Sequence, residues 1–541
     1  MVNERVKIME REIFYNGDIM TLENEGEYVE AVYVEDGIIK KCGSINELKE
    51  LAGDVVKITD LEGKTMIPAF IDPHSHFASV GQMATSCDLA DCTNFDQIVQ
   101  ALKKHIEEKK IPEGEMVTGI NYDHNYLEEK AHPTKDVLDR VSTKHLIVVC
   151  HTSGHLGSVN SLVLEKMGLN DDSEFGMGGK YARYEGSREL NGHMEENAFM
   201  AARRLAKTPS KEEMETLVLA GQEEYLKNGI TTVQNGGSMP EQMNILMDLA
   251  EKDQFTLDVV NYMMIAATTK EQMYSYKKYI GKYYNRLKVG GYKMFLDGSP
   301  QGKTAWMSEP YEGETEYRGY PILTDEAAKL FAERAISEEM QLLTHCNGDA
   351  ASEQLINAYT QAEDGKGIKS TLRPVMIHSQ TVREDQLERM TDIGMIPSIF
   401  VAHTYYWGDI HLKNMGEKRG NNISPARTAL DKGHIINFHQ DTPVLKPNML
   451  ETIWCAVNRI TKSGKEIGPN QRISVYEALR AVTYGGAYEY FEENEKGTIK
   501  EGKVADLVVL SENPMKVDKM KIKDIKVLKT YKNGRIVYSL K

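Results

Sequence analysis

The sequence predicts an α/β protein: a (β/α)8 TIM-like barrel with a discontinuous β-sandwich domain built from both chain ends. Eight short apolar runs alternate with helical patterns in the middle of the chain, which is typical of parallel βαβ units. Both ends carry short apolar runs separated by turn signals, which is typical of antiparallel strands. The chain has 541 residues, more than one hydrophobic core usually supports, so we expect at least two structural units.

The two chain ends, residues 1–65 and 490–541, are predicted to form one β domain. Chain termini often lie close together in space, so strands from both ends can share a domain. Tight hairpin turns need residues that tolerate positive φ. Such turns are expected at three dipeptides: Asn16-Gly17, Asp36-Gly37 and Asn533-Gly534.

Residues 66–489 are predicted to form the barrel. Its eight candidate strands are the runs at 66–72, 229–234, 256–264, 288–296, 341–345, 374–379, 395–403 and 434–441. The segment between the first two, residues 78–228, is too long for one crossover helix and is predicted to be an insertion. Within it, residues 145–153 resemble a strand, and the Gly-rich stretch 175–186 is expected to be an irregular loop.

The charge balance argues against nucleic-acid and membrane partners. The chain has 65 Lys and Arg against 81 Asp and Glu, a net charge of −16, which repels phosphate backbones and anionic lipids. Its N-terminus lacks an apolar signal region, and its six cysteines include no CxxC pair. We therefore expect a soluble cytoplasmic protein, and a homodimer because two-fold assemblies are the commonest.

Metal-ligating residue types recur at the ends of the predicted strands. His74 and His76 close the first run, and positions i and i+2 of an extended segment point to the same side. Four further candidates lie at or near other strand ends: Lys293, His345, His378 and Asp441. Because a barrel brings these ends together, the pattern predicts a site for zinc or a related divalent ion.

Four other histidines are not predicted to bind metal. They lie in polar or helical stretches and are expected at the solvated surface: His105, His132, His193 and His411.

The sequence resembles the amidohydrolase superfamily, and within it the metal-dependent amidohydrolase family that includes N-substituted formamide deformylase. The resemblance covers nearly the whole chain. The segments that carry it are MIPAFIDPHSHF, SGHLGSVNS, GITTVQ, YKMFLDGS, THCNGDAA, IHSQ, HTYYWGD, HQDTPV and GTIKEGKVADLVVL.

The resemblance implies a metal centre in which His74 and His76 bind the more buried ion, while His345 and His378 bind a second. Asp441 would bind the buried ion and also transfer the proton during hydrolysis. Lys293 matches a position at which such enzymes often carry a carboxylated lysine between two metals. A carbamate is an anionic oxygen donor, which suits a position between two cations.

The implied cofactor is one or two divalent ions per chain, with zinc as the expected metal. The implied substrate is a small-molecule N-acyl or N-formyl amide, cleaved at a non-peptide C–N bond by a metal-activated hydroxide. His155 and His403 are candidates for substrate contact.

Two alternatives remain open at this point. A deaminase of the same superfamily would use one metal and lack the barrel lysine, whereas Lys293 is present here. A non-catalytic relative would keep the fold as a binding protein, but it would be expected to have lost at least one of the six candidate ligands.

Overall fold

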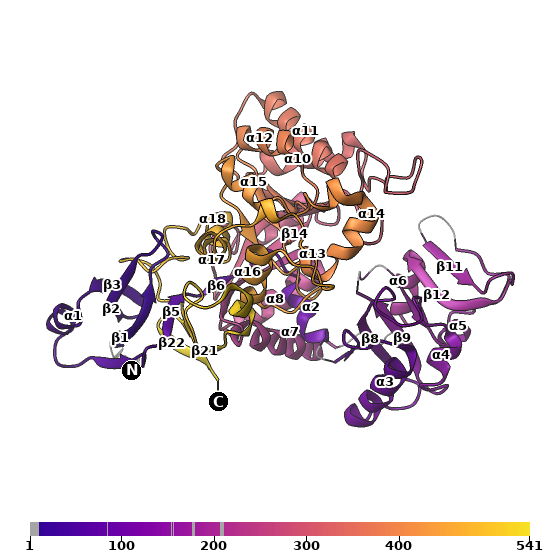
Figure 1. The fold of residues 1–541 in the computed structure, drawn as a ribbon, viewed down its shortest axis with the longest axis horizontal. Coiled ribbons are helices and arrows are strands. Elements are labelled where there is room, and N and C mark those ends of the chain that lie inside the picture. Colours follow the sequence, from indigo (N-terminus) through magenta and orange to yellow (C-terminus); the bar gives the residue numbers. More distant parts are fainter. Residues whose placement is uncertain are drawn as a thin grey trace. The chain divides into compact units, whose positions relative to one another are not determined.

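The computed structural model describes residues 10–83, 85–152, 154, 156–175, 179–205 and 210–540. They divide into two compact units (Figure 1). The first consists of Met1–Ala78 with Gln222–Lys541, and the second is Ser79–Gly221. The second unit falls within the segment predicted as an insertion, residues 78–228.

In the first unit, strands from both chain ends pair in one mixed sheet with the order β22-β21-β20-β5-β1-β2-β3, and β4 pairs with β1. The antiparallel pairing of β5 with β20 joins the two ends of the chain. The predicted two-layer sandwich stays a prediction. The strands are β1 Arg11–Met20, β2 Tyr28–Glu35, β3 Ile38–Gly43, β4 Lys57–Asp60, β5 Thr65–Pro68, β20 Leu507–Leu510, β21 Val527–Lys532 and β22 Arg535–Ser539.

Two of the three predicted hairpin turns are confirmed. Asp36 and Gly37, with φ of 50° and 81°, connect β2 to β3. Asn533 and Gly534, with φ of 48° and 73°, connect β21 to β22. Positive φ at both central residues matches the twist of the flanking strands.

The third turn prediction, Asn16-Gly17, is wrong, because both residues lie inside β1. The register of β1 against β2 shifts between Tyr15 and Ile19, so the dipeptide forms a bulge. At this bulge β1 changes its parallel partner. The residues of β1 before the bulge pair with β4, and those after it pair with β5.

The middle of the chain forms a curled, all-parallel sheet of eight strands whose spatial order follows the chain order. All eight predicted runs contribute a strand. They are β6 Phe70–Ile71, β13 Ile230–Ser238, β14 Asp258–Met264, β15 Leu287–Phe295, β16 Gln341–Cys346, β17 Val375–His378, β18 Ile396–Ile399 and β19 Asn437–Phe438. The helices before and between them are α7 Lys211–Leu226, α8 Pro240–Glu251, α9 Lys270–Ser275, α10 Asp325–Ser337, α11 Asp349–Lys366, α12 Glu384–Asp392, α13 His403–Tyr406, α14 Gly408–Gly420 and α15 Ala426–Asp431.

The two edges of this sheet approach each other beyond the strand ends. The His76 N–H, after β6, donates to the Thr442 carbonyl, after β19, at 2.7 Å. No ladder joins β6 to β19 among the described residues, so the fully closed barrel stays a prediction. Among the described residues, three α-helices follow β19: α16 Met449–Asn458, α17 Val475–Ala481 and α18 Tyr484–Glu489. Ala487 of α18 and the adjoining Tyr490 pack into the apolar core of the sheet.

Buried charges tie the C-terminal strands to this sheet. Asp258, at the start of β14, accepts ion pairs from Lys496 at 2.7 Å and Lys532 at 2.5 Å. Lys532, in β21, also contacts Asp506 at 2.6 Å and is 2% exposed. Because buried charges are tolerated only when paired, this network fixes the terminal sheet against the parallel one.

The second unit has a sheet of its own, with the order β11-β12-β10-β9-β8-β7. Residues 145–153, predicted as a strand, contain β9. The prediction of an irregular loop over 175–186 is wrong for Gly179–Arg183, which pairs with β12 as strand β11. The strands are β7 Cys87–Asp88, β8 Met116–Tyr122, β9 Leu146–His151, β10 Leu156–Val159, β11 Gly179–Arg183 and β12 Leu190–Glu196. Its helices include α3 Phe95–Lys109, α4 Lys135–Asp139, α5 Ser161–Lys166 and α6 Asn197–Arg203.

Among the described residues, no helix has both the length and the apolar character needed to cross a membrane.

Replacement of Lys532 by Met is expected to lower the free energy of unfolding by about 3–5 kcal/mol, because it removes one partner from a buried ion-pair network. Urea denaturation measures this loss. Lys529→Met, on the same strand, is the matched control, since Lys529 is only half-buried and should change stability little. Equal unfolding midpoints for the two variants would contradict the role given to the network.

Candidate metal centre

The six predicted ligands all lie at the carboxyl-terminal ends of the parallel strands. His74 and His76 follow β6, Lys293 lies in β15, His345 lies in β16, His378 ends β17, and Asp441 follows β19. Ring centroids of His74 and His76 are 5.3 Å apart, and those of His345 and His378 are 4.4 Å apart. His74 also lies 5.6 Å from His378, so the two histidine pairs form one group.

Hydrogen bonds fix the proton of each ring in the first pair. His74 Nδ1 lies 2.6 Å from Gln234 Oε1, and His76 Nδ1 lies 2.8 Å from the Gly236 carbonyl oxygen. Both partners only accept, so each Nδ1 carries a proton and each Nε2 presents a lone pair. These Nε2 atoms lie 3.2 and 3.4 Å from Asp441 Oδ1.

This arrangement suits a cation. Asp441 Oδ1 is buried and has no hydrogen-bond partner among the described residues. Two lone pairs therefore face a carboxylate oxygen at close range, and a cation between them would remove the repulsion. Two imidazole nitrogens and a carboxylate oxygen, all within 4.8 Å of one another, suit a divalent ion of the zinc class.

The second histidine pair presents nitrogen atoms to the same region. His345 Nε2 lies 3.1 Å from both the Gly298 carbonyl oxygen and Asn347 Nδ2. His345 Nδ1 lies 2.8 Å from His378 Nε2. Burial, followed by the neighbouring His345, lowers the pKa of His378 well below its ordinary value. The His378 ring is thus neutral, as metal ligation requires.

Lys293 extends from β15 into the group. It is fully buried, and its Nζ lies 3.1 Å from His74 Nε2. Burial lowers the pKa of this amine to about 7, since transfer from water disfavours the charged form. A large share of Lys293 is therefore a neutral amine near pH 7.

The buried side-chain amide of Gln234 orients the ring of His74. Gln234 accepts from His74 and donates through Nε2 to the Pro73 carbonyl and to Glu489 Oε1, the latter at 3.1 Å. Asn437 donates to the other oxygen of Glu489 at 2.8 Å. Such outer partners fix the tautomer and the ring orientation of a ligating histidine.

His439 is a site residue that the sequence analysis missed. It is fully buried, and its ring lies 5.1 Å from those of His74 and His378. Neither of its ring nitrogens has a hydrogen-bond partner among the described residues. The i, i+2 spacing that identified His74 and His76 also relates His439 to Asp441, and could have found it.

Backbone strain marks two of the strand ends. His378 and Asp441 have φ of 76° and 53°, values that residues with a side chain adopt rarely. Such strain concentrates at functional sites because the surrounding structure must maintain it.

Of the two residues predicted to contact the substrate, only His403 lies among the described residues. His155 lies outside the described residues. His403 begins α13 and is buried, with Nδ1 3.1 Å from His411 Nε2. Its ring packs on Phe400, which in turn packs on His439.

The prediction that four other histidines are solvent-exposed is wrong. His105, His193 and His411 are buried, and His132 is half-buried. His411 stacks against His403, with the rings inclined by 8°. Polar neighbours in sequence did not reveal that these rings turn inward.

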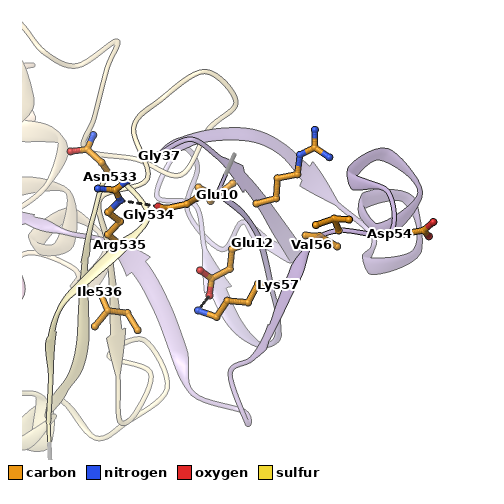
Figure 2. Close-up of a pocket in the computed structure, with 13 residues that line it drawn as sticks. Glu10, Glu12, Gly37, Asp54, Val56, Lys57, Asn533, Gly534, Arg535 and Ile536 are labelled. Carbon is orange, nitrogen blue, oxygen red and sulfur yellow. Dashed lines mark hydrogen bonds and ion pairs between the residues drawn. The ribbon is translucent and has the colours of Figure 1, made fainter. Parts of the chain in front are cut away.

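A surface pocket lined by residues near both chain ends is a poorer candidate for a metal site. Four of its charged side chains form two ion pairs: Arg535 with Glu10 and Lys57 with Glu12, both at 2.8 Å (Figure 2). Its lining contains no histidine or cysteine, so it offers no comparable ligands.

Comparison with known proteins agrees with this geometry. The sequence model of the amidohydrolase family matches residues 57–538. The chain belongs to the amidohydrolase family. It is a member of the amidohydrolase superfamily with an α/β fold.

Individual relatives cover almost the whole chain. The putative amidohydrolase YtcJ of Bacillus subtilis (strain 168) is 27% identical over 538 residues, covering 97% of this chain and 99% of its own. N-substituted formamide deformylase of Arthrobacter pascens is 24% identical over 544 residues, covering 97% of both chains. An uncharacterized metal-dependent hydrolase from Pyrococcus horikoshii OT3 shares the fold, with a TM-score of 0.76 at 22% identity over 94% of this chain and 99% of that one.

Replacement of Gln234 by Leu is expected to weaken metal binding by about 10- to 100-fold, because His74 loses the acceptor that fixes its tautomer. Competition with a chelator measures the affinity. Gln354→Leu removes a buried amide from α11, where it bonds to Leu323 and Asp325, and should leave the affinity unchanged. Wild-type affinity in the Gln234 variant would contradict the positioning role.

Proposed function

We propose that this protein hydrolyses the C–N bond of a small N-acyl or N-formyl amide. The observation that carries the proposal is the convergence of His74 Nε2 and His76 Nε2 on Asp441 Oδ1, with Lys293, His345 and His378 beside them. The deformylase from Arthrobacter pascens supports the substrate class, since its name specifies an N-substituted formamide.

We assign one cation to His74, His76 and Asp441, and a second to His345 and His378. When bound, such ions supply Lewis acidity and lower the pKa of water towards about 7. Zinc is the metal we propose, because imidazole and carboxylate ligands suit it.

Asp441 is the proposed acid–base group. As a metal ligand its carboxylate would be ionised, so it can accept a proton from the attacking water. It then returns that proton to the amine nitrogen as the C–N bond breaks, which makes the amine a neutral leaving group.

His439 is proposed to contact the substrate. Burial keeps its pKa well below the ordinary value, so the ring is neutral, with one nitrogen to donate and one to accept. A hydrogen bond from it to the substrate carbonyl would stabilise the negative charge that develops there.

Lys293 is proposed to be carboxylated. A neutral amine attacks CO₂ to form a carbamate and releases one proton, and burial makes that neutral form accessible. The anionic product could bind cations on both sides. This lysine favours the amidohydrolase over the one-metal deaminase.

Turnover is tested by a screen of N-formyl and N-acyl amines for amine release, with Asp441→Asn as the decisive variant. The expected loss in kcat is about 10²- to 10⁴-fold, because the amide cannot accept the proton. Asp409→Asn, at a half-buried aspartate that accepts hydrogen bonds from Thr461 and Ser463, should retain activity. Full activity in the Asp441 variant would refute the proton-transfer role.

Carboxylation of Lys293 is tested with ¹³C-bicarbonate and ¹³C NMR of the metal-loaded protein. The wild type should give a carbamate signal that Lys293→Arg lacks, because a guanidinium stays protonated and does not attack CO₂. Metal content should fall by about one ion per chain in the variant. A wild-type spectrum without the signal would contradict the assignment.

A further inference from the structure

A second group of metal-ligating side chains lies in the unit Ser79–Gly221. Asp123 and His124 directly follow β8, and His151 ends β9. These strands are parallel neighbours, with Tyr122 opposite His151 in the register. The three side chains therefore meet at the carboxyl-terminal edge of a parallel pair, where ligand sites of open α/β sheets commonly lie.

The ligand atoms of this group have the separation that a bound ion requires. His124 Nδ1 lies 3.2 Å from His151 Nε2, and Asp123 Oδ1 lies 3.8 and 3.5 Å from these two nitrogens. Ligands about 2.0–2.2 Å from a tetrahedral zinc lie roughly 3.3–3.6 Å from one another. One ion can thus contact all three atoms with only small side-chain movements.

The group favours a cation electrostatically. The Asp123 side chain is only 11% exposed, and its carboxylate charge would attract a cation at this position. Asn125 donates both its backbone N–H and its side-chain amide to Asp123 Oδ1, at 2.9 Å each. These bonds fix the carboxylate as outer partners fix a metal ligand.

Two more histidines enclose the group. The ring of His132 lies 4.1 Å from that of His124 and stacks at 4.0 Å on that of His193. These rings shield the group from solvent on one side.

We propose that Asp123, His124 and His151 form a separate binding site for a first-row divalent cation of the zinc class. Two imidazoles and one carboxylate are ligands that zinc, cobalt and nickel accept. The His124 side chain is 30% exposed, which gives an ion access from solvent and leaves room for water as a further ligand. The ion would join the ends of β8 and β9. A direct hydrogen bond between the two rings is the alternative that needs no metal.

The test uses the full-length protein, stripped with chelator, reloaded with Co²⁺ and desalted before elemental analysis. His124→Gln should bind one ion per chain fewer than the wild type. His124→Cys should keep that ion, because the ligating Nδ1 lies only two bonds from Cβ and a thiolate reaches nearly the same point. The cysteine variant should also gain a sulfur-to-cobalt charge-transfer absorption that the wild type lacks.

A matched control is His105→Gln, in the same unit, where the ring contacts the Thr85 carbonyl; it should bind as much Co²⁺ as the wild type. Circular dichroism checks that each variant is folded. Undiminished cobalt in His124→Gln would overturn the proposal, and so would a cysteine variant that loses the ion and lacks the new absorption. The result is independent of the centre at Asp441. The double variant Asp441→Asn with His124→Gln should bind one ion per chain fewer than the single variant Asp441→Asn.

Discussion

The constraint on which the site depends is the close approach of His74 Nε2 and His76 Nε2 to the Asp441 carboxylate. Their other ring nitrogens donate to Gln234 and Gly236, so the lone pairs have no alternative direction. Without a positive charge this arrangement is unfavourable, and with one it becomes a ligand set. Much of the surrounding structure serves to hold these three groups in place.

The parallel sheet achieves this by bringing its two edges together at one end. His74 and His76 follow β6, and Asp441 follows β19. The strands between them carry Lys293, His345 and His378. Behind them, Gln234 connects His74 to the buried Glu489 of α18. The segment after α18 is itself anchored, since Lys496 and Lys532 both pair with Asp258. The terminal sheet thus supports the site indirectly, through buried charges.

The strand ends, and the candidate ligands that cluster there, could be predicted from the sequence because both depend on local pattern. The eight apolar runs each contain a strand, and the HxH spacing indicated two rings on one side. His439 was missed because an imidazole beside Asp441 has no local signal apart from its spacing. His132, His193 and His411 were predicted at the surface because burial depends on distant segments, here on β-strand pairing and ring stacking. Asn16-Gly17 looked like a hairpin turn, but β1 exchanges its partner β4 for β5 at that point.

The most direct measurement of the central claim is anomalous X-ray diffraction from crystals of zinc-loaded protein, recorded at the zinc absorption edge. The account predicts a peak within bonding distance of His74 Nε2, His76 Nε2 and Asp441 Oδ1. Zinc-saturated crystals without density at that point would contradict it, whatever other sites contained metal.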